Sequence, residues 1–182
     1  MGVRNDLVRS FRWVDGHADV WRWFSDGELF RKIGGELADP FRDVGVTKVA
    51  AIEARGFLLA GAVAKELEAG VVGIRKKGGA LPGARSEVLT SPDYRGRRLT
   101  LVMQSDPFSG RDKVLLVDDW IETGSQALGA RALIEGTGAR YAGLAVVVRD
   151  GTSIEVQERL QPLHVLIDAE AFGASDALPS KT

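Results

Sequence analysis

Short apolar runs alternate along this chain with longer stretches rich in Ala and Leu. Five runs have the length and β-branched content of strands buried on both faces, and they cover residues 46–52, 70–74, 114–117, 141–148 and 163–167. Stretches with helical character follow three of these runs, at residues 57–68, 127–135 and 153–159. This alternation predicts an α/β fold with a doubly wound, mostly parallel sheet.

Residues 84–112 interrupt the alternation, because they are polar and rich in turn-forming residues. Residues 86–90 and 97–104 have strand character, and Ser91 to Gly96 join them. Two such runs with a short Pro- and Gly-containing connection predict an antiparallel β-hairpin. We expect its tip to be flexible and long enough to close over a site at the sheet edge.

At its 182 residues the chain fits one domain with a sizeable core. We expect this core over residues 40–173, preceded by a small N-terminal hood over residues 1–39 and followed by a frayed tail over residues 174–182. Within the hood, apolar spacing predicts a helix over residues 4–13, and alternation predicts a short strand over residues 19–24.

A second hood helix is predicted to start at Asp26, a typical N-cap residue, and to run toward Leu37. The tryptophans that precede it have two interpretations. They either pack in the core, or they stack against a flat heterocycle, which aromatic faces suit.

The composition narrows the class of protein. The formal net charge is −1 and the pI is near 6.2, which argues against a broad nucleic-acid-binding or anionic-membrane-binding surface. The absence of cysteine excludes disulfides, thiolate catalysis and cysteine-based zinc sites, and two histidines are too few for a histidine-rich metal site. No secretory signal or uninterrupted membrane-length apolar stretch occurs, so we expect a soluble, cytoplasmic protein.

The longest polar turn follows the strand-like run over residues 114–117. Asp118 and Asp119 end this run, and a loop of Glu122-Thr123-Gly124-Ser125-Gln126 leads into a helix. Backbone amides, hydroxyls and the positive end of the helix dipole favour an anion at such a turn. Adjacent carboxylates beside an anion suggest a ligand that carries phosphate and hydroxyl groups together with Mg²⁺.

Two other turns carry cations. Arg55, in Glu53-Ala54-Arg55-Gly56, suits bidentate hydrogen bonding to a phosphate, and Gly56 lets backbone amides approach the same phosphate. Arg75-Lys76-Lys77 precedes a Gly-rich loop, and this combination suggests a polyphosphate clamp. Because ligands of open α/β sheets bind at the carboxyl ends of the strands, we expect the three turns to form one site.

Two other nucleotide-binding classes fit less well. Adjacent aspartates after an apolar strand also occur in Walker B-like strands, but the chain has no Gly-x-x-x-x-Gly-Lys-Ser/Thr motif. Residues 136–141 resemble part of a dinucleotide-binding Gly-x-Gly-x-x-Gly motif, but Tyr141 replaces the last glycine and a predicted helix comes first. We therefore reject a P-loop and a dinucleotide site.

The segment Val-Leu-Leu-Val-Asp-Asp-x-x-x-Thr-Gly, from Val114 to Gly124, resembles the phosphoribosyl pyrophosphate (PRPP) motif of type I phosphoribosyltransferases. Together with Glu53-Ala-Arg-Gly-Phe57 and Arg75-Lys-Lys…Leu-Pro-Gly83, it resembles adenine phosphoribosyltransferases over about residues 46–169. The resemblance implies the type I phosphoribosyltransferase fold. It also implies a reaction in which ribose 5-phosphate is transferred from PRPP to a purine base, with adenine as the favoured base, and pyrophosphate is released. It also implies Mg²⁺ and a homodimer.

The resemblance also implies roles for single residues. Asp118 and Asp119 hold the ribose hydroxyls of PRPP, directly or through its metal ion or a water. The 5′-phosphate loop consists of Glu122, Thr123, Gly124, Ser125 and Gln126. The pyrophosphate loop and the charges added to it comprise Glu53, Ala54, Arg55, Gly56, Arg75, Lys76 and Lys77. The candidate catalytic residues are Arg55 and, on the hairpin, Tyr94 and the proton acceptor Asp93.

Several positions depart from the family's usual pattern. The phosphate loop, usually Ala-Thr-Gly-Gly-Thr, has Glu122, Ser125 and Gln126 here, and the hairpin's Glu-Tyr-Gly-Thr appears as Asp93-Tyr-Arg-Gly96. Two alternatives therefore stay open. One is a related transferase for xanthine, hypoxanthine or a specialised heterocycle, and the other is a non-catalytic PRPP-sensing regulator.

Overall fold

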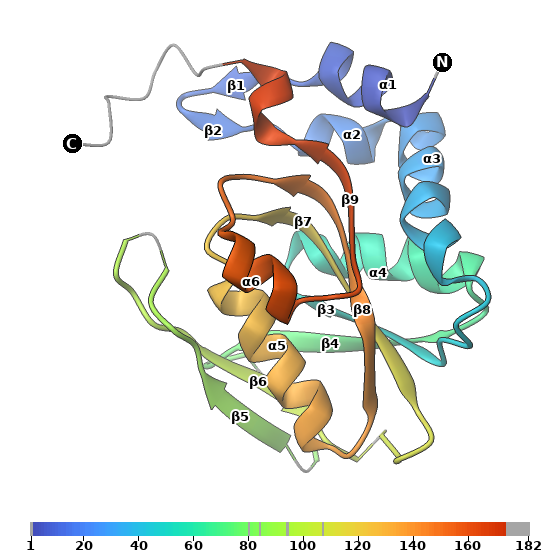
Figure 1. The fold of residues 1–182 in the computed structure, drawn as a ribbon, viewed down its shortest axis with the longest axis vertical. Coiled ribbons are helices and arrows are strands. Elements are labelled where there is room, and N and C mark those ends of the chain that lie inside the picture. The colour runs from blue at the N-terminus through green and yellow to red at the C-terminus, as the bar shows by residue number, and fades with distance from the viewer. Residues whose placement is uncertain (1, 80, 84, 94, 107, 174–182) are drawn as a thin grey trace.

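The computed structural model describes residues 2–79, 81–83, 85–93, 95–106 and 108–173, so the predicted tail lies outside the described residues. Within these residues, seven strands form one sheet in the order β5-β6-β4-β3-β7-β8-β9 (Figure 1). The strands are β3 (Lys48–Ile52), β4 (Gly70–Lys76), β5 (Arg85–Leu89), β6 (Thr100–Gln104), β7 (Lys113–Ile121), β8 (Arg140–Arg149) and β9 (Leu163–Asp168).

Five of these strands run parallel. β3 pairs in parallel with β4 and β7, and β8 continues the parallel order from β7 to β9. β5 and β6 are antiparallel to each other, and β6 is antiparallel to β4. The predicted α/β fold with a mostly parallel sheet and an added hairpin is therefore confirmed.

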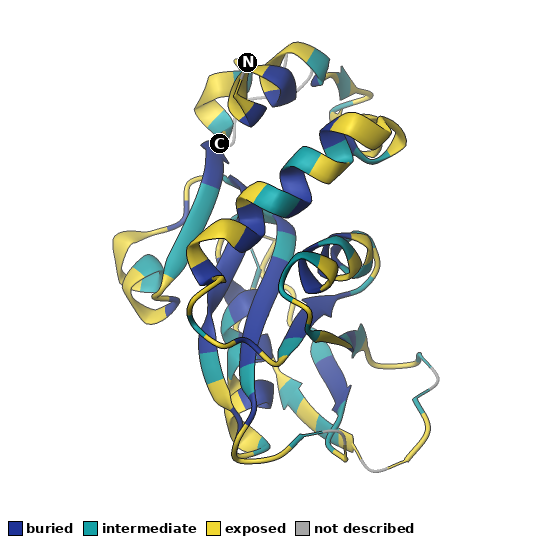
Figure 2. Cartoon of the chain, turned by 90° about the vertical axis from the view of Figure 1, so that its right-hand side faces the viewer, coloured by how far each residue is buried: buried dark blue, intermediate teal, exposed yellow. Residues whose placement is uncertain are grey.

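Helices cover both faces of the sheet, as a doubly wound topology requires. α4 (Arg55–Glu66) connects β3 to β4, α5 (Ser125–Gly136) connects β7 to β8, and α6 (Ile154–Arg159) connects β8 to β9. One buried cluster includes side chains of α3 (Gly27–Ala38) and α4, and a second includes those of α5. Figure 2 shows long buried stretches along the central strands, which explains their nearly continuous apolar runs.

The predicted cap of α3 is confirmed. Oδ1 of Asp26 accepts hydrogen bonds of 3.0 Å from the backbone amides of Glu28 and Leu29. Leu29 and Ile33 then pack in the core, and the 3₁₀ helix η1 (Asp39–Phe41) follows α3. None of the helices in the described part of the chain is long and apolar enough to cross a membrane.

The predicted strand over residues 19–24 is wrong, because helix α2 (Trp21–Ser25) occupies this segment. Val20 and Trp23 are fully buried, whereas Trp21 is 55% exposed. Buried side chains three residues apart are typical of a helix, so the alternation of aromatic and polar residues did not mark two faces of a strand.

The hood consists of α1 (Val3–Ser10), the antiparallel pair β1 (Trp13–Val14) and β2 (His17–Ala18), α2 and α3. Its part before α3 lies at the top of Figure 1. The sequence predicted the first helix but not the short antiparallel pair. Buried hood residues belong to the same apolar cluster as residues of the sheet. The 3₁₀ helix η2 (Ala169–Phe172), from the C-terminal end of the described chain, packs with the hood.

An aromatic cluster holds the hood, the sheet and η2 together. Phe11 stacks on Phe172 with ring centroids 4.1 Å apart, and Trp120 of β7 stacks on Phe172 at 6.2 Å. Trp13 and Trp23 complete the cluster through contacts with Phe11 at 5.2 and 5.8 Å. The core-packing interpretation is therefore confirmed for Trp23, which is fully buried.

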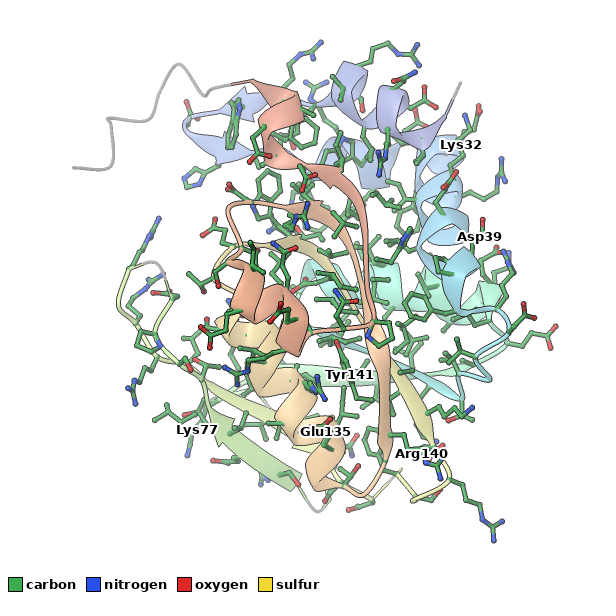
Figure 3. All side chains as sticks on the ribbon, viewed as in Figure 1. Lys32, Asp39, Lys77, Glu135, Arg140 and Tyr141 are labelled. Atoms are coloured by element: carbon green, nitrogen blue, oxygen red, sulfur yellow. The ribbon has the colours of Figure 1, made fainter. Side chains whose placement is uncertain are left out.

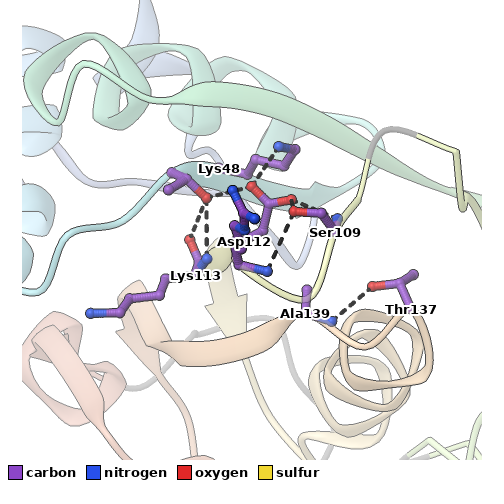
Figure 4. A network of polar contacts seen from close by, with 8 residues as sticks. Lys48, Ser109, Asp112, Lys113, Thr137 and Ala139 are labelled. Atoms are coloured by element: carbon purple, nitrogen blue, oxygen red, sulfur yellow. Dashed lines mark hydrogen bonds and ion pairs between the residues drawn. The ribbon is translucent and has the colours of Figure 1, made fainter.

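Asp112 is a buried carboxylate just before β7, at the amino end of the central strands (Figure 4). Its Oδ1 lies 2.7 Å from Nζ of Lys48 and accepts a 2.8 Å hydrogen bond from Oγ1 of Thr47. Its Oδ2 accepts bonds of 2.7 and 3.0 Å from the amide and hydroxyl of Ser109. The ion pair with Lys48, followed by these hydrogen bonds, holds the pKa of Asp112 well below its usual range.

We expect Asp112→Asn to destabilise the protein by about 2 kcal/mol, because an amide cannot replace a charge that accepts several hydrogen bonds. A depressed folded-state pKa stabilises the fold above the unfolded pKa, and this contribution is lost as the pH falls below about 4. Urea unfolding at pH 7 and at acid pH measures both effects. The exposed Asp43→Asn is the control, and equal stability of the two variants would contradict the role of Asp112.

Candidate functional site

The acid pair lies on β7, and the strand is longer than the sequence predicted. It continues through Asp118 and Asp119 to Ile121, because Trp120 and Ile121 still pair with Val148 and Arg149 of the long strand β8. The predicted end of the strand at the carboxylates is therefore wrong. The two aspartates are instead held by strand pairing, and Asp119 is only 4% exposed.

Both carboxylates of the acid pair, Asp118 and Asp119, have raised pKa values. Burial, followed by the neighbouring charge of Asp119, raises the pKa of Asp118 well above its usual range. Burial also raises the pKa of Asp119, although the nearby Arg55 opposes this effect. Asp118 Oδ1 accepts a 2.9 Å hydrogen bond from the Asp119 amide, whereas Oδ2 of Asp119 is buried without a hydrogen-bond partner among the described residues.

Arg55, the first residue of α4, brings the turn after β3 to the acid pair. Its Nε lies 2.9 Å from Oδ2 of Asp119, which is an ion-pair distance although the angle does not suit a hydrogen bond. A Cβ added to the neighbouring Gly56 would lie 3.5 Å from both Oδ1 of Asp118 and the carbonyl of Val117. The turn after β3 is thus in direct contact with the acid pair of β7 at one rim of the sheet.

The basic turn, Arg75 to Lys77, joins the same rim through Glu53. It begins inside the strand, because Arg75 and Lys76 are the last residues of β4, so the predicted end of this strand at Ile74 is wrong. Nε of Arg75 lies 2.8 Å from Oε2 of Glu53, and the amide of Lys76 donates a 2.7 Å hydrogen bond to Oε1. Burial acts to raise the pKa of Glu53, but the hydrogen bonds from Arg75 and Lys76 outweigh it and leave this pKa lowered. The basic turn, the turn that carries Arg55 and the acid pair therefore meet at this rim.

Lys77 extends the basic turn toward the hairpin. Its Nζ lies 3.0 Å from Oε2 of Glu87 on β5, and Figure 3 shows Lys77 beside the hairpin strands, across the view from Lys32 of α3 and Asp39 of η1. Both partners of the Lys77 pair are exposed, so water screens this interaction and it contributes little to stability.

The predicted phosphate loop forms the start of α5. Gly124 has a φ of +70° and is the N-cap, and Ser125 is buried as the first residue of the helix. A helix of this length leaves the amides of its first turn without helical acceptors, so they are available to an anion. The Ala54 and Gln126 positions flank the same rim, at the N-termini of α4 and α5.

We expect Gly124→Ala to destabilise the protein by about 2 kcal/mol and to weaken binding at the phosphate loop. The positive φ disfavours any side chain, and the new Cβ would collide with Cγ1 of Val156 on α6. Urea unfolding and titration with inorganic phosphate measure the two effects. Gly27→Ala at the start of α3, where nothing lies within 4 Å of the new Cβ, should leave both unchanged.

The hairpin tip contains Asp93 in a turn of its own. Oδ1 of Asp93 accepts hydrogen bonds of 2.9 and 2.8 Å from the amides of Arg95 and Arg97, and the Arg97 guanidinium lies 3.3 Å from Oδ2. The hydrogen bond from the backbone amide of Arg97 makes the largest contribution to lowering the pKa of Asp93. Tyr94 lies outside the described residues, so its predicted role stays a prediction.

Two residues of the site were not predicted from the sequence. Thr152 is buried and donates a 2.5 Å hydrogen bond from Oγ1 to the carbonyl of Glu122, which fixes the phosphate loop. Trp120 connects the acid pair to the aromatic cluster. Asp150-Gly151-Thr152 follows the predicted strand over residues 141–148, so a polar turn at the same rim was the available signal for Thr152.

The acid pair suits a Mg²⁺ ion that arrives with a phosphorylated ligand. The described residues contain no cluster of three or more acidic, histidine or cysteine side chains around one point, so they do not form a complete protein cage for a metal. Mg²⁺ in proteins usually takes one or two carboxylates and completes its coordination with water and substrate phosphates. Asp118 and Asp119 fit this type of site, since Oδ2 of Asp119 has no hydrogen-bond partner in the described chain and pairs only by charge with Arg55.

Comparison with known proteins agrees with this geometry. The phosphoribosyl transferase domain family matches residues 27–162. An adenine phosphoribosyltransferase of Dinoroseobacter shibae is 44% identical over 133 residues, which is 71% of each chain. Solved adenine phosphoribosyltransferases of Rhodothermus marinus (31% identity, TM-score 0.81) and Giardia lamblia (29%, 0.82) cover 91% and 92% of this chain, and the alignments cover 98% of each of theirs. The chain therefore belongs to the phosphoribosyltransferase family, among the adenine phosphoribosyltransferases.

Proposed function

We propose that the protein transfers ribose 5-phosphate from PRPP to adenine, giving AMP and pyrophosphate in purine salvage. The observation that carries the proposal is the 2.9 Å approach of Arg55 to Asp119, which joins a cationic turn to an acid pair at one rim. A sugar with a 5′-phosphate and a pyrophosphate group needs both kinds of contact within a few ångströms. The helix start at Gly124 supplies an anion site on the same strand connection.

In the proposed reaction, the bond from the anomeric carbon of ribose to pyrophosphate breaks, and a new bond forms to a ring nitrogen of adenine. Positive charge develops on the sugar and negative charge on the leaving pyrophosphate. Arg55 and Lys76 stabilise the leaving group by opposite charge in a partly enclosed site. When bound, Mg²⁺ supplies further neutralisation of the pyrophosphate, and Asp118 and Asp119 are the residues that would hold it with the ribose hydroxyls.

Adenine loses a proton in this reaction, and Asp93 is the proposed acceptor with Tyr94 as its neighbour on the hairpin. A carboxylate already bound to the amides of Arg95 and Arg97 and with a lowered pKa is a weak base. Proton removal is accordingly the smaller contribution, and stabilisation of the leaving group is the larger one. Closure of the hairpin would exclude water from the reacting centre.

A competition assay tests the choice of base. Adenine, hypoxanthine, xanthine and guanine are offered together with Mg²⁺ and PRPP, and the nucleotide products and released pyrophosphate are quantified. AMP as the main product supports the proposal. Another nucleotide would make the protein a transferase for that base, and PRPP binding without pyrophosphate release for any base would make it a regulator.

Two further properties belong to the proposal. A homodimer is expected from the family resemblance, and light scattering on the purified protein gives the mass that decides it. A cytoplasmic location is expected because PRPP and nucleoside monophosphates are charged metabolites that stay inside cells. Fractionation with an antibody against the chain tests this location.

A further inference from the structure

Glu53 has the wrong charge for the ligand that its turn is expected to hold. A carboxylate repels a pyrophosphate group, yet Glu53 lies two residues before Arg55 in the proposed pyrophosphate loop. The structure shows where its charge is directed. Both of its oxygens face the end of β4, with Oε2 2.8 Å from Nε of Arg75 and Oε1 2.7 Å from the amide of Lys76.

The Arg75 side chain is held on two sides. Besides the contact with Glu53, its guanidinium lies against the backbone of Gly79, where an added Cβ would come within 2.5 Å of Nε and 2.6 Å of Cζ. The Arg75 side chain is 36% exposed and that of Glu53 only 20%. Arg75, the first cation of the basic turn, is therefore held by contacts with other groups of the protein, whereas the Lys76 side chain is exposed.

We infer that Glu53 is a positioning residue, which ties the basic turn at the end of β4 to the turn that carries Arg55, so that the two form one preorganised cradle. Arg75 is its partner in this tie. The backbone reinforces the arrangement, because the Glu53 amide donates a 2.9 Å hydrogen bond to the carbonyl of Ile74. The inference rests on the proposed function only in taking the pyrophosphate group of PRPP as the ligand of the cradle.

A double-mutant cycle tests the tie with Glu53→Gln, Arg75→Gln and the double variant. Each single variant should raise the KM for PRPP on the order of tenfold while kcat stays within about twofold, because loosened turns must be ordered when PRPP binds. The KM of the double variant should be no higher than that of the single variant with the higher KM, since both changes break the same tie. Arg75→Lys should recover part of the loss.

Direct binding of pyrophosphate by Arg75 predicts a different pattern. Removal of the repelling carboxylate would then lower the KM in Glu53→Gln, and the effects of the two changes would add. Either result overturns the inference. Glu87→Gln is the matched control, because it removes the exposed partner of Lys77 on the same turn without touching the tie, and it should leave the KM unchanged.

Hydrogen exchange without PRPP separates this inference from the proposed function. The Lys76 amide should be protected in the wild type and in Glu53→Gln, which keeps an acceptor oxygen, and should exchange at least about tenfold faster in Glu53→Ala. Equal exchange in all three proteins would overturn the tie. A wild type that shows this protection but does not bind PRPP would instead refute the proposed function, and thermal unfolding verifies that each variant is folded.

Discussion

Arg55→Ala is expected to lower kcat/KM for PRPP about a hundredfold, which corresponds to roughly 3 kcal/mol of transition-state stabilisation. Arg55 is fixed at the first position of α4, close to Asp119, before any ligand arrives. A preorganised cation stabilises the charge that develops on the leaving pyrophosphate without a cost of reorganisation. The measurement is pyrophosphate release with saturating adenine over a range of PRPP concentrations.

Arg42→Ala is the matched control for this experiment. Arg42 also forms ion pairs, at 2.8 Å with Asp39 and 3.2 Å with Glu66, but these partners lie outside the three turns of the site. It should retain wild-type turnover. Undiminished turnover of Arg55→Ala under the same conditions would remove Arg55 from the proposed mechanism and, with it, the main source of leaving-group stabilisation.

Asp119→Asn is expected to reduce turnover on the order of a hundred- to a thousandfold and at the same time to stabilise the fold at pH 7. Activity is expected to fall because a neutral amide cannot replace the carboxylate that the proposed mechanism assigns to the ribose hydroxyls and Mg²⁺, or its charge beside Arg55. Stability rises because burial raises the pKa of Asp119, so its charged form is a cost to the folded state. The measurements are pyrophosphate release and thermal unfolding.

The pH dependence distinguishes this explanation from a change in packing. A group whose pKa is raised in the folded state favours folding most at a pH below its unfolded value, and that contribution is lost as the pH rises through its folded value. The stability advantage of Asp119→Asn should therefore be largest at neutral pH and should disappear below about pH 4. An advantage that does not depend on pH would contradict the electrostatic explanation.

Asp112→Asn serves as the comparison, since it lies at the other end of the same strand and should have the opposite effect. Asp112 is satisfied by Lys48, Thr47 and Ser109, whereas Asp119 has a buried oxygen without a hydrogen-bond partner in the described part of the chain. Proteins commonly keep such a destabilising arrangement where a ligand completes it.

Sequence reasoning succeeded where burial or turn chemistry leaves a regular pattern. The parallel strands are buried on both faces, so continuous apolar runs marked them, and the N-cap of Asp26 marked the start of α3. The placement of the three predicted turns at one rim also followed from topology, because the carboxyl ends of β3, β4 and β7 lie there.

Sequence reasoning failed where contacts between distant segments decide the structure. The helix α2 buries Trp23 against a cluster that includes Phe172, and the extension of β7 to Ile121 follows from its pairing with the long strand β8. Local spacing carries no information about such partners. The pairing of Glu53 with Arg75 across 22 residues was hidden for the same reason.

The stacking of Phe11 on Phe172 has a consequence for how the chain acquires its shape. Phe11 and Phe172, from near the two ends of the described chain, must meet before the hood and η2 complete a roof over the sheet, although every strand of the described residues precedes Phe172 in synthesis. During translation the sheet can form while this roof is still unfinished. Shortening the chain before residue 169 should thus leave a protein with a native-like sheet and an N-terminal segment open to proteases.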